Sequence, residues 1–256
     1  MHDKQYKYID FVMAIFITSL LVSNITSSAK IVSLGFSISG LPLSFDAGTL
    51  LFPISYIFGD ILTEVYGYKI TRRIIWFGFI CTALAGFTFW IVSKLPGDPQ
   101  WGEFVANHIF SNDNIHHKDS LLIGQAAYNA ILGGISTGGI IFASLIAYIA
   151  GEFSNSYILA RMKILTRGRF LWTRTIGSSF FAQAIDSLIF VSIATLSGVF
   201  PASAMLSIIV ANFIFKLSIE IIFTPVTYRV INFLKTSEQT DHYDIGTNFN
   251  PFSLFK

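Results

Sequence analysis

Long apolar stretches with few charges are the feature that most constrains this chain. Hydrophobic residues make up 53% of its 256 positions and charged residues only 12%, whereas an average soluble domain is about 25% charged. A helix needs about 20 mostly apolar residues to cross a bilayer. This composition excludes a soluble globular domain and a disordered chain. The single cysteine, Cys81, also excludes a disulfide-stapled fold.

We therefore expect an all-α integral membrane protein with six transmembrane helices. The predicted spans cover residues 8–29, 47–66, 74–95, 135–159, 175–196 and 203–228. Residues 121–132 are apolar but too short to cross the membrane, so we expect a short interfacial or re-entrant helix there. Residues 1–235 form one transmembrane domain, and residues 236–256 form a polar tail that we expect to be mobile.

The positions of the basic residues predict the orientation of these spans. Most of the 17 Lys and Arg residues lie before the first span, in the second and fourth connections or in the tail. Connections that carry more Lys and Arg remain in the cytoplasm. We therefore expect both termini to be cytoplasmic.

Two carboxylates lie four residues apart near the end of the second predicted span. Asp60 and Glu64 share a helix face, with Tyr56 one turn earlier. An ionisable group inside a bilayer needs a partner, a wet cavity or a function. One interpretation is that Arg72 or Arg73 lies between the two carboxylates. The other is that one carboxylate accepts hydrogen bonds from a substrate.

The fifth and sixth predicted spans also contain charged residues. Asp186 and Gln183 lie on one stripe of the fifth span, and a carboxylate beside an amide suits a heterocycle with adjacent N–H groups. Alternatively, Asp186 pairs with Lys216 of the sixth span. Lys216 and Glu220 are four residues apart and could neutralise each other, whereas an unpaired Lys216 would indicate a proton-linked or anion-binding role.

Two further features concern the first two predicted spans. Asn24 lies beside a stripe of serines that is typical of close helix packing. Because an amide is costly to bury without a partner, we expect Asn24 to line a pocket. Pro53 cannot donate a backbone hydrogen bond, so we expect a kink in the second span near Asp60.

Several common motifs are missing from the sequence. It contains no GxxxxGK[ST], so no P-loop ATPase is encoded in this chain, and neither HExxH nor GxSxG occurs. We expect no enzymatic activity, no catalytic residues, no metal and no cofactor. The net charge of +2 is too small to indicate nucleic-acid binding.

Four segments resemble the vitamin uptake transporter family, in its queuosine precursor branch. They are GDILTEVYGY at 59–68 followed by Arg72 and Arg73, WTRTIGSS at 172–179 followed by Gln183 and Asp186, ASLIAY at 143–148, and Lys216 with Thr224 and Pro225. The resemblance extends over residues 24–228. The outer loop and the tail carry none of it.

The resemblance implies a bacterial inner-membrane importer of the deazapurines preQ0 and preQ1, which feed queuosine synthesis in tRNA. It implies a fold like the six-helix substrate-binding component of energy-coupling-factor transporters, working without a dedicated ATPase. The expected partners are the deazapurine and the lipid bilayer, with a homo-oligomer left open. An alternative is a substrate-binding subunit that needs a separate ATPase module.

Charged and amide side chains of the predicted spans form the expected site. The expected substrate-binding residues are Asn24, Asp60, Glu64, Gln183 and Asp186, and the expected gating or charge-pair residues are Arg174, Lys216 and Glu220. We hypothesise that Asp186 or Glu64 accepts the ring N–H and the amine of a 7-deazaguanine, and that Arg174 anchors the topology or pairs with a carboxylate of the second span. Proton coupling and facilitated diffusion both remain open.

Overall fold

The computed structural model describes residues 6–38, 41–109, 117–136 and 139–253. Helices dominate these residues, and two strands join them. The elements are α1 (Ile9–Ala29), β1 (Ile31–Ile38), β2 (Leu41–Asp46), a 3-10 turn (Ala47–Leu50), α2 (Phe52–Tyr66), α3 (Tyr68–Lys94), α4 (Pro99–Ile109), α5 (His117–Ser136), α6 (Gly139–Leu165), α7 (Leu171–Leu196), a 3-10 turn (Ala202–Ala204) and α8 (Met205–Glu238).

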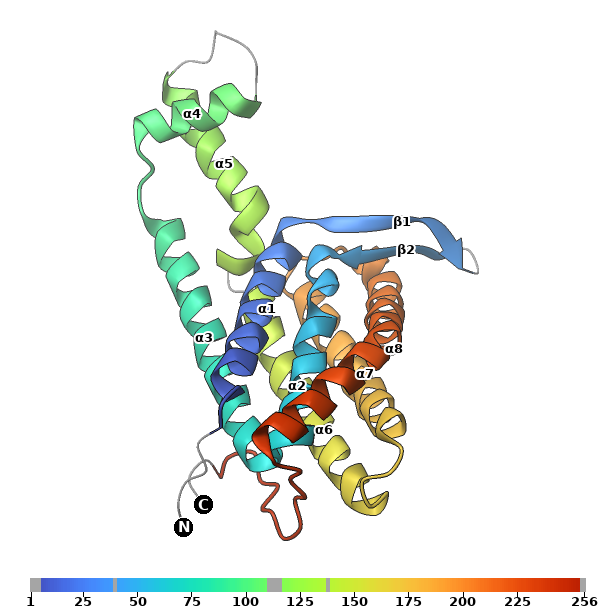
Figure 1. Cartoon of the computed structure of the whole chain (residues 1–256). Coiled ribbons are helices and arrows are strands. Elements are labelled where there is room, and N and C mark those ends of the chain that lie inside the picture. Colours follow the sequence, from blue (N-terminus) through green and yellow to red (C-terminus); the bar gives the residue numbers. More distant parts are fainter. Residues whose placement is uncertain (1–5, 39–40, 110–116, 137–138, 254–256) are drawn as a thin grey trace.

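The long helices form a bundle with two distinct ends (Figure 1). At one end the carboxylate of Glu238, the last residue of α8, accepts hydrogen bonds from the backbone N–H groups of Lys7 and Tyr8 at 2.9 and 2.7 Å. We call this the terminal end. The β1–β2 hairpin lies at the opposite end of the bundle, which we call the hairpin end (Figure 1).

Five helical segments are long and apolar enough to cross a membrane, so the chain is a multi-pass membrane protein. Within the described residues they are Ile9–Ala29, Tyr68–Lys94, Ser120–Leu165, Leu171–Leu196 and Ala202–Glu238. The predicted count of six is not confirmed, because α2 has only 15 residues. The helix expected at 121–132 is longer than predicted, since α5 has 20 residues.

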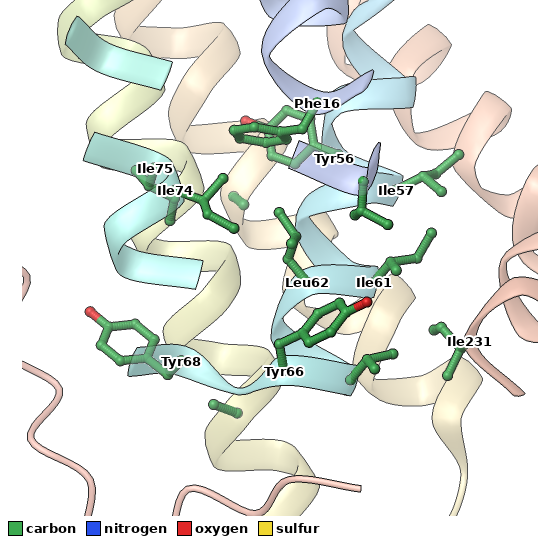
Figure 2. Packing of buried hydrophobic residues seen from close by; sticks show 14 of the residues in the cluster. Phe16, Tyr56, Ile57, Ile61, Leu62, Tyr66, Tyr68, Ile74, Ile75 and Ile231 are labelled. Carbon is green, nitrogen blue, oxygen red and sulfur yellow. The ribbon is translucent and has the colours of Figure 1, made fainter. Parts of the chain in front are cut away.

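Helix α2 lies in the middle of the bundle. All of its residues except Ile54 and Phe58 are buried, and its apolar side chains pack between Ile74 and Ile75 of α3 and Ile231 of α8 (Figure 2). A helix enclosed by protein needs less length than one that faces lipid across the whole bilayer. This enclosure is consistent with the short length of α2, which has 15 residues although we predicted a full span at 47–66.

The prolines act differently in the two helices that contain them. Pro53 lies in the first turn of α2, where its missing N–H leaves no helical hydrogen bond unmade. The predicted kink at Pro53 is therefore wrong. Pro225 does lie inside α8, and this helix bends along its length (Figure 1), as an interior proline causes.

The hairpin corrects the expectation of an all-α fold. Strands β1 and β2 pair antiparallel from Ile31 opposite Asp46 to Ile38 opposite Leu41. Leu43 and Phe45 of β2 are buried with Ala211 of α8. The hairpin therefore packs against the bundle, although its residues had been assigned to a connection between spans.

Asp46 fixes the hairpin to two helices. Its carboxylate is 1% exposed and accepts hydrogen bonds from Thr49 at 2.9 Å and from the amide of Asn212 at 2.8 Å. Ser27 of α1 donates a further hydrogen bond to it. Three donors compensate the burial of this charge, and they hold α1, the hairpin and α8 together.

The polar tail is bound to the start of α3, whereas we had expected it to be mobile. The carboxylate of Asp244 accepts hydrogen bonds from the backbone N–H of Tyr68 at 3.0 and 3.2 Å. Arg72 donates to two tail carbonyls at 2.8 Å each, and Trp76 donates to a third at 2.8 Å. Asp244 thus satisfies an N–H group at the start of α3 that has no partner within the helix.

We expect Asp244→Ala to release this tail contact and to lower the free energy of unfolding by about 1 kcal/mol, as the loss of a helix cap does. Burial raises the pKa of the Asp244 carboxyl, but hydrogen bonds from His242, Tyr68 and Thr247 outweigh it and hold the pKa below its ordinary value of 3.8. A lowered folded-state pKa means that the stabilisation is present at neutral pH. It disappears as the pH falls through the folded-state pKa.

Denaturant unfolding in detergent, measured for both proteins across acidic pH, tests this expectation. The matched control is Asp10→Ala, because Asp10 is an exposed carboxylate in α1. Equal stabilities of Asp244→Ala and the wild type at neutral pH would contradict the proposed role of the carboxylate.

Candidate functional site

A group of polar side chains lies buried where α2, α6, α7 and α8 meet. Each of them is at most 2% exposed. We call it the interior polar cluster, and its members are Asp60, Glu152, Asn155, Gln183, Asp186, Lys216 and Glu220. Of the eight residues expected at the site, Asp60, Gln183, Asp186, Lys216 and Glu220 belong to it.

Glycines on two helices allow these elements to approach closely. A Cβ atom on Gly151 of α6 would lie 2.6 Å from the hydroxyl of Tyr56 and 3.2 Å from the Cβ of Asp186. A Cβ atom on Gly59 of α2 would lie 2.9 Å from Oε2 of Glu152. Any side chain at either position would push the polar groups apart, so the close packing of α2, α6 and α7 depends on these glycines.

Lys216 neutralises one carboxylate of the cluster. Its Nζ lies 2.7 Å from Oδ2 of Asp186, and both side chains are at most 3% exposed. The same Nζ lies 4.4 Å from the centre of the Phe52 ring. Of the alternatives for Lys216, the structure therefore shows the pair between helices. Glu220 is not its partner and accepts a hydrogen bond from Nε2 of Gln183 at 2.5 Å.

Asp60 is held by an amide and has no cation beside it. Nδ2 of Asn155 donates to its carboxylate at 2.7 Å, and the hydroxyl of Ser179 donates to Oδ1 of Asn155 at 3.4 Å. This chain of hydrogen bonds joins α2, α6 and α7. Within the part of the chain that the structure describes, neither Asp60 nor Glu152 nor Glu220 forms an ion pair.

Several acceptors of the cluster have no donor. Among the described residues, Oε2 of Glu152, Oε1 of Gln183 and Oε1 of Glu220 are buried without a hydrogen-bond partner. Buried polar atoms in proteins are almost always hydrogen-bonded, because leaving one unpaired costs about 1–3 kcal/mol. The cluster can therefore accept hydrogen bonds from a molecule that brings its own N–H groups.

Asn24 lies apart from these contacts. Its Nδ2 donates to the carbonyl of Leu20 in its own helix at 2.9 Å, and its Oδ1 is buried without a partner. The structure shows no hydrogen bond between Asn24 and the interior polar cluster. Its role as a pocket residue stays a prediction.

A second set of charges surrounds Glu64 at the terminal end. We call it the terminal ion cluster, and its members are Glu64, Lys163, Arg174, Lys235 and Asp241. Arg174 donates to both oxygens of Glu64, from Nε at 3.0 Å and from Nη2 at 2.7 Å. This bidentate geometry is the strongest form of an ion pair.

Two lysines complete the terminal ion cluster. Nζ of Lys235 lies 2.6 Å and Nζ of Lys163 lies 3.3 Å from the same oxygen of Glu64. Both lysines also lie 2.7 Å from Asp241 of the tail. Burial raises the pKa of the Asp241 carboxyl, yet hydrogen bonds from both lysines outweigh this effect and lower the pKa overall. The cluster thus ties α2, α6, α7, α8 and the tail together.

These contacts revise the expected partners of Asp60 and Glu64. Arg72 is not between them, because its guanidinium donates to carbonyls of the tail. Arg174 contacts Glu64, one of the two carboxylates considered for it, and its gating role stays a prediction. Asp60 and Glu64 share a helix face but belong to different clusters: Asp60 has no cation beside it, whereas three cations surround Glu64.

Sequence reasoning missed two members of the interior polar cluster. Neither Glu152 nor Asn155 is among the residues expected at the site. Tyr148, Glu152 and Asn155 recur at intervals of four and three residues in an otherwise apolar helix, which places them on one face. This spacing is the signal that could have found both.

A cavity of about 750 Å³ opens at the hairpin end of the bundle. It is bordered by the last turns of α1, α3 and α5 and by the turn after α7. The lining includes Ser28, Trp90, Lys94, Asn129 and Gly198. The interior polar cluster has a different lining, since its residues come from α2, α6, α7 and α8.

Comparison with known proteins places the chain among transporters. The family model described as "Putative vitamin uptake transporter" matches residues 46–230, a range that includes the whole interior polar cluster. A protein of Bacillus subtilis (strain 168) named "Probable queuosine precursor transporter" is 26% identical over 199 residues, which cover 77% of this chain and 76% of that protein. No solved structure matches. Because the family match covers well over half of its length, this chain belongs to the vitamin uptake transporter family.

Proposed function

We propose that this chain imports a queuosine precursor, a base of the 7-deazaguanine class such as preQ0 or preQ1, across the inner membrane of a bacterium. The name of the Bacillus subtilis relative supports the substrate class. The observation that carries the proposal is the set of buried acceptors without donors on Glu152, Gln183 and Glu220. Membership in a transporter family makes a membrane enzyme a poor alternative.

The chemistry of the base suits these acceptors. A 7-deazaguanine presents a ring N–H and an exocyclic amine side by side, and one carboxylate can accept both. Glu220 and Glu152 each have an oxygen without a donor, whereas Asp186 is engaged by Lys216 and Glu64 by three cations. We therefore assign the reading of the guanine-like edge to Glu220 or Glu152, with Asp60 and Gln183 beside them.

The two ends of the bundle suggest a path. The base would enter through the cavity at the hairpin end, reach the interior polar cluster, and leave at the terminal end. The terminal ion cluster closes that end, because its ion pairs join four helices and the tail. Release would require the pair between Arg174 and Glu64 to separate, which makes Arg174 a gating residue and not a ligand.

Uptake is tested in a bacterium that cannot make preQ0 and lacks its own importer. We expect expression of this chain, with nanomolar preQ0 or preQ1 in the medium, to restore queuosine in tRNA, scored by a boronate gel shift. Proteoliposomes containing only this chain then test whether a separate ATPase module is needed. An absence of any shift, with the protein confirmed in the membrane, would contradict the proposal.

We expect Gln183→Ala to reduce uptake about tenfold or more, because it removes an acceptor and leaves Glu220 without its donor, and hydrogen bonds to charged groups contribute about 1.5–3 kcal/mol. The matched control is Gln125→Ala, since Gln125 is on α5, outside the interior polar cluster, and donates a hydrogen bond to Asn129 in its own helix. Initial uptake rates are compared at equal membrane levels. Similar rates in both variants would remove Gln183 from the site.

The proposed orientation places the terminal end in the cytoplasm, since the connection from Arg161 to Arg174 carries five basic residues. We expect alkaline phosphatase to be active when fused after Gly97, beyond the end of α3, and inactive when fused after Gly168, between α6 and α7. Activity after Gly168 and none after Gly97 would contradict the proposed orientation.

A further inference from the structure

The interior polar cluster contains more carboxylates than cations. Asp60, Glu152, Asp186 and Glu220 carry carboxyl groups, and Lys216, paired with Asp186, carries the positive charge. Asp60, Glu152 and Glu220 are close enough to repel one another if all are ionised. Burying a charge without a partner costs several kcal/mol, and a carboxylate in that position takes up a proton instead.

Within the described part of the chain, the surroundings of these three carboxyls supply no cation besides Lys216. Among the described residues, the titratable or charged groups that face them are Tyr56 and Glu64 from α2, Tyr148 from α6, Asp186 from α7 and Lys216 from α8. Cys81 of α3 lies near Tyr148. The positive groups around Glu64 are bound in the terminal ion cluster.

The unpartnered oxygens give independent evidence of a ligand. Gln183 is fully buried, its Nε2 donates to Glu220, and its Oε1 has no donor. Oε2 of Glu152 and Oε1 of Glu220 are also without donors, although the hydroxyl of Ser179 lies near Glu220 and donates to Asn155. An amide oxygen and two carboxyl oxygens together suit a ligand that brings several N–H groups and a positive charge.

We propose that the site selects a cationic 7-deazaguanine over neutral ones, and that the positive group displaces a proton from Glu152 or Glu220. This inference rests on the proposed function and names the member of the substrate class. The aminomethyl group of preQ1 is a primary amine that is protonated at neutral pH, whereas the nitrile of preQ0 carries no charge. The ammonium supplies donors for the unpartnered oxygens and the cation that the cluster lacks.

The charges balance in this exchange. One O–H bond of a carboxyl group breaks, and its proton leaves to water. The ammonium keeps all of its protons and donates hydrogen bonds to the carboxylate that results. The net charge of the cluster with its bound ligand equals that of the protonated, empty cluster, so no uncompensated charge is buried at either stage.

Binding to the purified full-length protein in detergent tests the proposal. The probes are preQ1, preQ0 and 7-hydroxymethyl-7-deazaguanine, which is a neutral match for preQ1 in size. We expect preQ1 to bind at least about tenfold more tightly than either neutral base, in line with hydrogen bonds to charged groups. We also expect about one proton to be released per bound preQ1, and its affinity to fall about tenfold per pH unit on acidification.

Two variants test which carboxyl group gives the preference for preQ1 and releases the proton. In Glu220→Gln and in Glu152→Gln, a neutral amide replaces a carboxyl group of the same shape, so at least one of them should lose most of the preference for preQ1 over the hydroxymethyl base and most of the proton release. Asp10→Asn is the matched control, since Asp10 is exposed on α1. This variant should leave the affinities for the three bases and the proton release unchanged. If a variant fails to fold, comparing the three ligands on the wild-type protein still tests the proposal.

The outcomes separate this inference from the function on which it rests. Equal affinity for preQ1 and the neutral bases, or binding of preQ1 without proton release, would overturn the inference and leave the import function standing. Failure of all three bases to bind would count against both, and the uptake assay would then decide whether the proposed function survives.

Discussion

The burial of carboxylates inside an apolar bundle is the constraint on which the rest of the structure depends. Each such group must be paired, hydrogen-bonded or protonated, because a bare charge in this environment is too costly. Helix α2 carries two of them, Asp60 and Glu64, and the neighbours of these two carboxylates differ. Three cations hold Glu64 at the terminal end, while Asp60 faces a cluster that is short of cations.

This difference divides the bundle into a closed end and a region suited to binding. The terminal ion cluster joins four helices and the tail through buried ion pairs, which lose much stability when one partner is removed. Among the described residues, the interior polar cluster keeps buried acceptors without donors. Under the proposed function, the terminal ion cluster closes one side of the binding region, and the base enters from the opposite side.

Much of this arrangement could be predicted from the sequence. Apolar length identifies the membrane class, and the cost of intramembrane charge singles out Asp60, Glu64, Asp186 and Lys216. The pairing of Asp186 with Lys216 was one of two alternatives, and the structure selects it. Helical spacing cannot decide between partners on one helix and partners on another, which is why Lys216 with Glu220 looked equally reasonable.

Other features depend on contacts between distant segments. The hairpin is stabilised by packing on α8 and by Asp46, and α2 reaches only 15 residues because protein encloses it. Arg72 binds the tail, while Lys163, Lys235 and Asp241 gather around Glu64 from 99 or more positions away. No local pattern encodes such neighbours.

The most direct test of the central claim is an experimental structure of this chain with a 7-deazaguanine base bound. We expect density for the base among α2, α6, α7 and α8, within hydrogen-bonding distance of Gln183 and of Glu220 or Glu152. A base bound elsewhere, for example only in the cavity at the hairpin end beside Trp90, with the interior polar cluster unchanged, would contradict it.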